Sequence, residues 1–81
     1  MSPSVLVVDD EPMILDIVRL TLEREGFDVY EAEDGYKAME KAREVIPDIV
    51  LLDVMMPDMD GFEVLKEIRS TSNVPVIMLT V

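Results

Sequence analysis

Acidic side chains follow two apolar segments of the sequence, at the point where each segment ends. Asp9 and Asp10 come directly after the apolar residues 5–8. Asp53 ends a second apolar run, residues 49–53. Short apolar runs are typical of buried strands, and open α/β sheets bind ligands at the carboxyl ends of their strands. If both strands belong to one sheet, their carboxylates share an edge, and a cation is needed there to offset the repulsion.

An acidic pocket of this kind supports the transfer of a phosphoryl group. Asp53 can act as a nucleophile and form an aspartyl phosphate. Because the transferred group is highly charged, the reaction needs a divalent cation between phosphoryl oxygen and carboxylate. Mg²⁺ suits this role, since it takes hard oxygen ligands and is usually held by one or two carboxylates. The alternative for any single aspartate at a strand end is a helix cap or a turn residue.

The elements that would position these carboxylates alternate along the chain. Apolar and β-favouring runs predict strands at residues 5–8, 27–32, 49–53 and 74–80. Apolar residues at helical spacing predict a helix from Pro12 to a stop at Gly26, and two more over residues 36–45 and 62–69. Strands separated by helices of this length imply a parallel sheet with right-handed crossovers.

Helical spacing also predicts which side of each helix faces the sheet. In the first helix the inward residues are expected to be Ile14, Ile17, Val18 and Leu22, with Thr21 on the same face. In the second helix they are Ala38, Met39, Ala42 and Val45. In the third helix they are Phe62, Leu65 and Ile68.

Three motifs together resemble the receiver domain of two-component response regulators. They are Val-Leu-Val-Val-Asp-Asp-Glu at 5–11, Leu-Leu-Asp-Val-Met-Met-Pro-Asp-Met-Asp-Gly at 51–61 and Pro-Val-Ile-Met-Leu-Thr at 75–80. The resemblance spans essentially the whole chain. It implies a flavodoxin-like α/β fold, with parallel strands in the order 2-1-3-4 and helices on both faces of the sheet.

The resemblance corresponds to the beginning of such a domain. Residues 1–81 are expected to be the N-terminal part, about two-thirds, of a single receiver domain truncated after its fourth strand, without the fifth strand and the last two helices. The family has a lysine at the end of the fifth strand that pairs with the phosphoryl oxygens, and no residue here takes that role. We therefore expect the family function to belong to the parent protein, and this chain to be phosphorylated weakly or not at all.

The resemblance also implies roles for particular residues. Asp53 would accept the phosphoryl group. Asp10, Asp53 and the backbone carbonyl of Met55 would bind Mg²⁺ directly, and Asp9 would act through water or from behind these ligands. The hydroxyl of Thr80 would hydrogen-bond a phosphoryl oxygen on Asp53 as the switch step. The alternative for Thr80 is an ordinary β-favouring residue of the fourth strand.

Other phosphate and metal sites fit the sequence less well. Residues 58–67 resemble part of an EF-hand loop, but Met56 stands at the first ligand position and cannot serve a hard cation. A haloacid-dehalogenase-type phosphatase needs a second acid two residues after the nucleophile, where Met55 stands. The sequence has no P-loop, no Gly-x-Gly-x-x-Gly and no histidine. Gly61 is expected to give structural support, through its backbone conformation or a close approach that a side chain would block.

Composition limits the setting in which the protein works. The chain has 81 residues, no cysteine and a hydrophobic share of 49%, which is ample for one core. No apolar run approaches the roughly 20 residues that span a bilayer, and no basic signal-peptide region precedes one. The net charge of −11 argues against binding of nucleic acid by this segment. We expect a cytoplasmic protein without a membrane partner.

Two hypotheses of function remain. In the first, the chain is a signalling module rather than an enzyme, phosphorylated by a sensor histidine kinase, and the parent protein is a transcriptional regulator whose output domain binds DNA. In the second, it is an inactive fragment that assembles through its last strand. Residues 74–80 are apolar on both faces and would form an open edge, so we expect a homodimer or a larger homo-oligomer.

Overall fold

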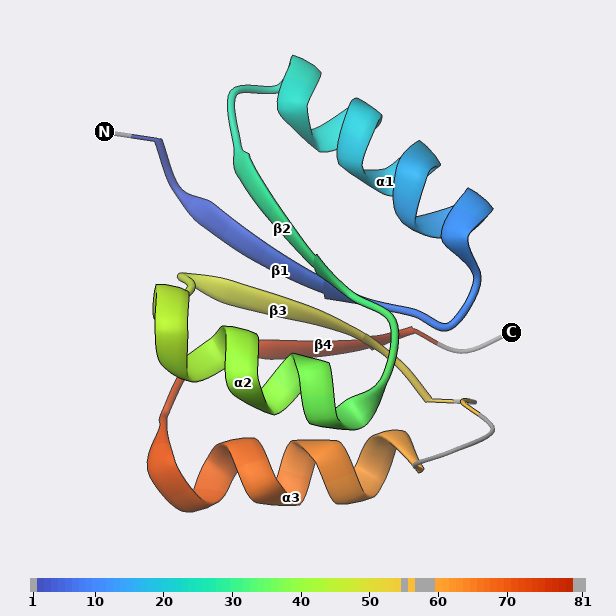
Figure 1. Cartoon of the computed structure of the whole chain (residues 1–81). Coiled ribbons are helices and arrows are strands. Elements are labelled where there is room, and N and C mark those ends of the chain that lie inside the picture. Colours follow the sequence, from blue (N-terminus) through green and yellow to red (C-terminus); the bar gives the residue numbers. More distant parts are fainter. Residues whose placement is uncertain (1, 55, 57–59, 80–81) are drawn as a thin grey trace.

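Strands and helices alternate along the whole chain, as predicted. The structure, a computed structural model, describes residues 2–54, 56 and 60–79. The elements are β1 (Ser4–Val8), α1 (Pro12–Arg24), β2 (Asp28–Ala32), α2 (Gly35–Val45), β3 (Ile49–Asp53), α3 (Gly61–Thr71) and β4 (Val76–Leu79) (Figure 1). Most bounds lie within one or two residues of those expected. The last strand begins at Val76 and not at residue 74 as predicted. Pro75, directly before it, has no N–H to donate to a sheet.

The four strands form one parallel sheet in the order β2-β1-β3-β4. This order confirms the flavodoxin-like topology. Val8 at the end of β1 pairs with Ala32 of β2 and with Leu52 of β3. Asp53 at the end of β3 pairs with Leu79 of β4. The carboxyl ends of all four strands therefore lie at one edge of the sheet.

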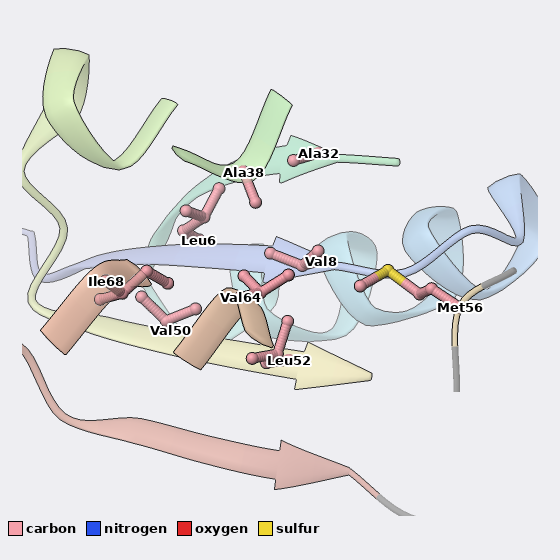
Figure 2. Packing of buried hydrophobic residues seen from close by; sticks show 9 residues of the cluster. All are labelled: Leu6, Val8, Ala32, Ala38, Val50, Leu52, Met56, Val64 and Ile68. Atoms are coloured by element: carbon pink, nitrogen blue, oxygen red, sulfur yellow. The ribbon is translucent and has the colours of Figure 1, made fainter. Parts of the chain in front are cut away.

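The helices cover the two faces of the sheet unequally. Figure 1 shows α1 on one face and both α2 and α3 on the other. On the face of α2 and α3, side chains of β1 and β3 pack against Ala38, Val64 and Ile68 in the larger core cluster (Figure 2). On the α1 face, Val5 and Val7 pack against Leu15. This alternation of inward positions along each strand fixes the register of the sheet.

Helix caps hold the starts of two helices at the carboxyl edge of the sheet. The side chain of Asp34 accepts a hydrogen bond of 2.8 Å from the backbone N–H of Lys37 at the start of α2. The side chain of Asp60 accepts one of 2.8 Å from the N–H of Phe62 at the start of α3. Both are N-caps that satisfy otherwise unpaired helix donors. Both helices begin after a strand, α2 after β2 and α3 after β3, so both starts lie near the edge of the sheet that carries the acidic residues.

The inward face predicted for α1 is partly wrong. Leu15 is the buried residue of this helix, and Val18 and Leu22 pack beside it as expected. Ile14 and Ile17 were predicted to face the sheet, but they are 36% and 55% exposed. Instead, α1 packs on Val5 and Val7 through Leu15. Arg19 of the same helix donates a hydrogen bond of 3.1 Å to Glu31 of β2. Apolar residues surround much of this helix, so spacing alone left its rotation open.

The inward face of α3 is also partly wrong. Ile68 is buried and Leu65 is partly buried, as predicted. Phe62 is 61% exposed, and Val64 takes the fully buried position of the first turn instead. Phe62 lies two positions before Val64, and residues two apart do not share one side of a helix, so Phe62 points away from the core when Val64 points into it. On α2, Ala38 is buried as expected.

Among the described residues, β4 pairs with β3 and with no strand on its other side. Val76 and Met78 pack against the larger core cluster, whereas Ile77 on the opposite face is 48% exposed. The last strand is therefore an edge strand with apolar residues on both faces, as the sequence predicted. No helix in the described ranges is long and apolar enough to cross a membrane.

Candidate functional site

The carboxylates of Asp9, Asp10 and Asp53 meet at the carboxyl edge of the sheet. β1 and β3 are neighbours, and the pairing of Val8 with Leu52 places the residues that follow them side by side. One carboxylate oxygen from each of the three aspartates lies within 4.8 Å of the other two. The acidic pocket expected from the two strand ends is therefore present in the fold.

Asp9 is the most deeply placed of the three. It is 7% exposed, and its Oδ1 accepts a hydrogen bond of 2.9 Å from the backbone N–H of Glu11. Its own N–H donates to the carbonyl of Ala32 on β2 at 3.1 Å. Burial raises the pKa of Asp9 above its ordinary value of 3.8, the Glu11 hydrogen bond opposes this, and the charges of Asp53 and Asp10 raise it further.

The contact with Glu11 was not foreseen, although the sequence contains a sign of it. An aspartate that accepts from the N–H two residues later forms an Asx turn. Here the turn stands directly before the proline that begins α1. Its effect is to fix the direction of the Asp9 carboxylate before any ligand arrives. An aspartate three residues before a helix start is the pattern that would have predicted this contact.

The donor set fits a hard divalent cation. Three carboxylates with oxygens this close repel one another, and one of them is buried, so the site is costly without a positive charge. Asp10 and Asp53 are only partly buried, which leaves an approach from solvent. Oxygen-only ligands in this number suit Mg²⁺, which keeps several waters, and exclude a thiolate or imidazole metal.

The raised pKa of Asp9 gives a prediction for the metal-free protein. Between pH 3.8 and its raised pKa, the folded chain keeps a proton that the unfolded chain has lost. The free energy of unfolding therefore falls as pH rises through this interval. Asp9→Asn keeps an oxygen for the Glu11 contact and removes the charge. In EDTA, urea unfolding should show this variant more stable than wild type at pH 7, and the gain should shrink toward pH 4. A constant difference at all pH values would contradict the assignment.

Two of the predicted site residues lie outside the described residues. Met55, predicted to offer its backbone carbonyl, is one of them, and Thr80 is the other. Leu79, the last residue of β4, pairs with Asp53. The roles proposed for Met55 and Thr80 stay predictions.

Gly61 also belongs to this edge of the sheet. Its backbone N–H donates to the carbonyl of Val54 at 3.1 Å. A Cβ atom at this position would lie 2.7 Å from the backbone oxygen of Asp53 and 2.7 Å from Cα of Val54. Of the two reasons expected for a glycine here, the structure confirms the close approach. Its φ is not positive, whereas that of Gly26 is +92°.

The sequence model of the family described as "Response regulator receiver domain" matches residues 5–81. The chain belongs to this family. Its members are the signalling modules of response regulators, and the strand order and acidic edge described above agree with that assignment.

Solved structures of receiver domains superpose closely on this one. The chemotaxis protein CheY4 of Vibrio cholerae has a TM-score of 0.93 at 38% identity, over 96% of this chain and 68% of that one. The N-terminal domain of a response regulator receiver protein from Methanoculleus marisnigri has a TM-score of 0.91 at 44% identity, over 95% and 65%. TrrA of Thermotoga maritima, solved in complex with Mg²⁺-BeF, has 0.90 at 39%, over 96% and 69%. The chain thus spans about two-thirds of the length of these solved chains.

Proposed function

We propose that this chain is the phosphoacceptor part of a two-component response regulator, and that Asp53 receives a phosphoryl group from a sensor histidine kinase. The observation that carries the proposal is the convergence of Asp9, Asp10 and Asp53 within 4.8 Å at the carboxyl edge of a receiver fold. Asp53 is only partly buried, so a phosphohistidine on a partner protein can reach it. The kinase is a transient partner in this scheme.

Each residue of the site has its own role in the phosphoryl transfer. A carboxylate oxygen of Asp53 forms the new P–O bond while the P–N bond to the kinase histidine breaks and the imidazole leaves with that bond's electrons. Asp10 and Asp53 would bind Mg²⁺ directly. Asp9, whose carboxylate is oriented by the Glu11 N–H, would contact the ion through a water or would contact its direct ligands. When bound, Mg²⁺ supplies positive charge that offsets the charge of the phosphoryl oxygens. The carbonyl of Met55 would be a third direct ligand, and the hydroxyl of Thr80 would bond a phosphoryl oxygen.

Mg²⁺ is expected to stabilise the folded chain, because a ligand that binds only the native form adds RT ln(1 + [L]/Kd) to the free energy of unfolding. At a concentration of 100 Kd this gain is about 2.7 kcal/mol. Asp10→Asn should remove most of the gain and leave the fold intact. Urea unfolding with and without Mg²⁺, followed by circular dichroism, measures both effects.

Asp28→Asn is the matched control for this experiment. It makes the same change of charge at an exposed residue that begins β2, at the opposite end of the sheet. This variant should keep the Mg²⁺ response of the wild type. An undiminished response in Asp10→Asn would count against the metal site.

The remaining parts of the proposal concern the role of the chain and of its parent protein. In this proposal the chain acts as a signalling module rather than an enzyme, and works in the cytoplasm. Binding of DNA belongs to an output domain of a transcriptional regulator and not to this segment, whose net charge of −11 opposes contact with a polyanion. The support for these statements is the family assignment together with the charge of the chain.

A second candidate is an inactive chain that self-assembles through β4, and the open edge of that strand favours it. Unpaired strand edges with apolar side chains pair readily with another chain. We expect light scattering after size-exclusion chromatography to give a dimer or a larger species at micromolar concentration. Ile77→Lys, which puts a charge on the edge strand, should shift the mass to that of a monomer, while Leu20→Lys on the outer side of α1 should not. A wild-type monomer would refute self-assembly.

The same chromatography separates the two candidates when Mg²⁺ and beryllofluoride are added. A shift in elution that depends on both additives and is lost in Asp53→Asn supports a working pocket. A stable oligomer that responds to neither supports the inactive chain.

A further inference from the structure

Gly61, the first residue of α3, lies against the backbone at the end of β3. A Cβ atom here would lie 2.7 Å from two backbone atoms, the oxygen of Asp53 and Cα of Val54, and 3.1 Å from the oxygen of Val54. Real Cβ atoms essentially never approach closer than 3.0 Å, and ordinary contact begins at 3.4 Å. A side chain at this position therefore demands a shift of about 0.3 Å to pass 3.0 Å, and of about 0.7 Å to reach ordinary contact at 3.4 Å.

The surrounding backbone leaves little freedom for that shift. The clashing atoms belong to main chain, which cannot rotate away as the end of a flexible side chain can. Val54 is bonded on two sides, because its N–H donates to the carbonyl of Leu79 on β4 and its carbonyl accepts from the N–H of Gly61. The start of α3 is also anchored, because Val64 in its first turn is fully buried in the core. Relief of the clash must therefore move the end of β3 or the first turn of α3.

We propose that Gly61 is a positioning residue for the acidic site, and that the missing side chain sets where the Asp53 carboxylate lies relative to Asp9 and Asp10. This inference rests on the proposed function, since it concerns the same pocket. The Asp53 carboxylate is attached to the backbone that a Cβ at position 61 would displace. Mg²⁺ demands near-ideal octahedral geometry with ligands at about 2.0–2.1 Å, so a displacement of a few tenths of an ångström weakens its binding.

The test compares Gly61→Ala with the same substitution at Gly26. Gly26 has a φ of +92° and open space around its Cβ direction, so alanine there strains the end of α1 without touching the site. Mg²⁺ affinity is measured by NMR titration, at a temperature where circular dichroism shows all three proteins folded. Gly61→Ala should raise the Kd for Mg²⁺ at least about tenfold, as loss of a group that orients a metal ligand does. The Kd of Gly26→Ala should stay within about twofold of wild type. Gly26 precedes the start of β2, at the opposite end of the sheet from the acidic cluster, and substitutions at distant positions act independently.

The outcomes decide between a positioning role and a merely structural one. A wild-type Kd in Gly61→Ala overturns the proposal, and so does an equal loss of affinity in both variants. If Gly61→Ala folds incompletely, trimethylamine N-oxide is added equally to all three proteins to restore the folded state.

A second measurement does not depend on metal binding. In a crystal structure of metal-free Gly61→Ala, the three carboxylates should no longer share the 4.8 Å span that they have here. An unchanged cluster overturns the positioning role even if the variant loses stability. If the wild type fails to bind Mg²⁺, the proposed function fails, and this crystal structure still decides whether Gly61 positions Asp53.

Discussion

Asp53→Asn is expected to abolish binding of beryllofluoride, the analogue of a phosphoryl group, while the fold stays intact. The carboxylate oxygen is the atom that bonds the incoming group, and a neutral amide offers neither its charge nor its nucleophilicity. The substitution also removes one of three carboxylates from the cluster and so lowers the repulsion among them in the metal-free chain. Fluorine NMR in the presence of Mg²⁺ measures the bound beryllofluoride signal, which should be weak but detectable for wild type and absent for the variant.

Asp34→Asn is the control for this prediction. Asp34 caps α2 by accepting from the N–H of Lys37, and asparagine caps helices equally well, so this change removes one negative charge and little else. The control should bind beryllofluoride as wild type does. A bound signal that survives in Asp53→Asn would refute Asp53 as the acceptor. The absence of a signal from the wild type as well would favour the inactive, self-assembling chain.

The site could be predicted from the sequence because two apolar strands end at carboxylates. Val5 to Val8 are buried on both faces of β1, so the run has no alternation and can be recognised as a central strand of a parallel sheet. Once β1 and β3 are neighbours in register, the residues after Val8 and Leu52 must lie together. Strand order came from the family resemblance, because periodicity alone does not say which strands are adjacent.

The rotation of α1 could not be predicted in the same way. Met13, Leu20 and Ile17 are all exposed, so the apolar residues of this helix extend well beyond the side that packs on the sheet. A stripe this wide fits several rotations equally well. The choice depends on how the helix packs on the sheet, where Leu15 contacts Val5 and Val7, residues that only the folded structure brings together. Tertiary contacts of this kind are absent from any local pattern.

The geometry around the pocket was also beyond prediction from spacing. The sequence shows that Gly61 stands eight residues after Asp53, but not that the two backbones come within contact distance. Nor does it show that Asp9 is almost completely buried while Asp10 beside it is not. Both features depend on how α3 and β2 close around the strand ends, which is decided by packing. They are the features that set the electrostatics and the position of the site.

Leu52→Ala should unfold most of the chain under conditions in which the wild type is folded. Leu52 is 0% exposed and lies on β3 in the larger core cluster, facing α3 (Figure 2). Deleting a buried leucine side chain to alanine costs about 2–5 kcal/mol, since the cavity that it leaves collapses only partly. A domain of this size has a free energy of unfolding on the order of 5 kcal/mol, and small domains bury proportionally less surface. Urea unfolding followed by circular dichroism should show a midpoint shifted close to zero denaturant.

Leu20→Ala is the matched control, because the same atoms are deleted from a side chain that is 55% exposed on α1. It should change the free energy of unfolding by less than about 0.5 kcal/mol, as surface substitutions do. Since Leu52 directly precedes Asp53, the core change also tests whether packing beneath the site matters for it. Saturating Mg²⁺ should restore part of the folded population of Leu52→Ala, because binding to the native form draws the equilibrium toward it. A Leu52→Ala chain as stable as Leu20→Ala would mean that the core does not lie where the structure places it.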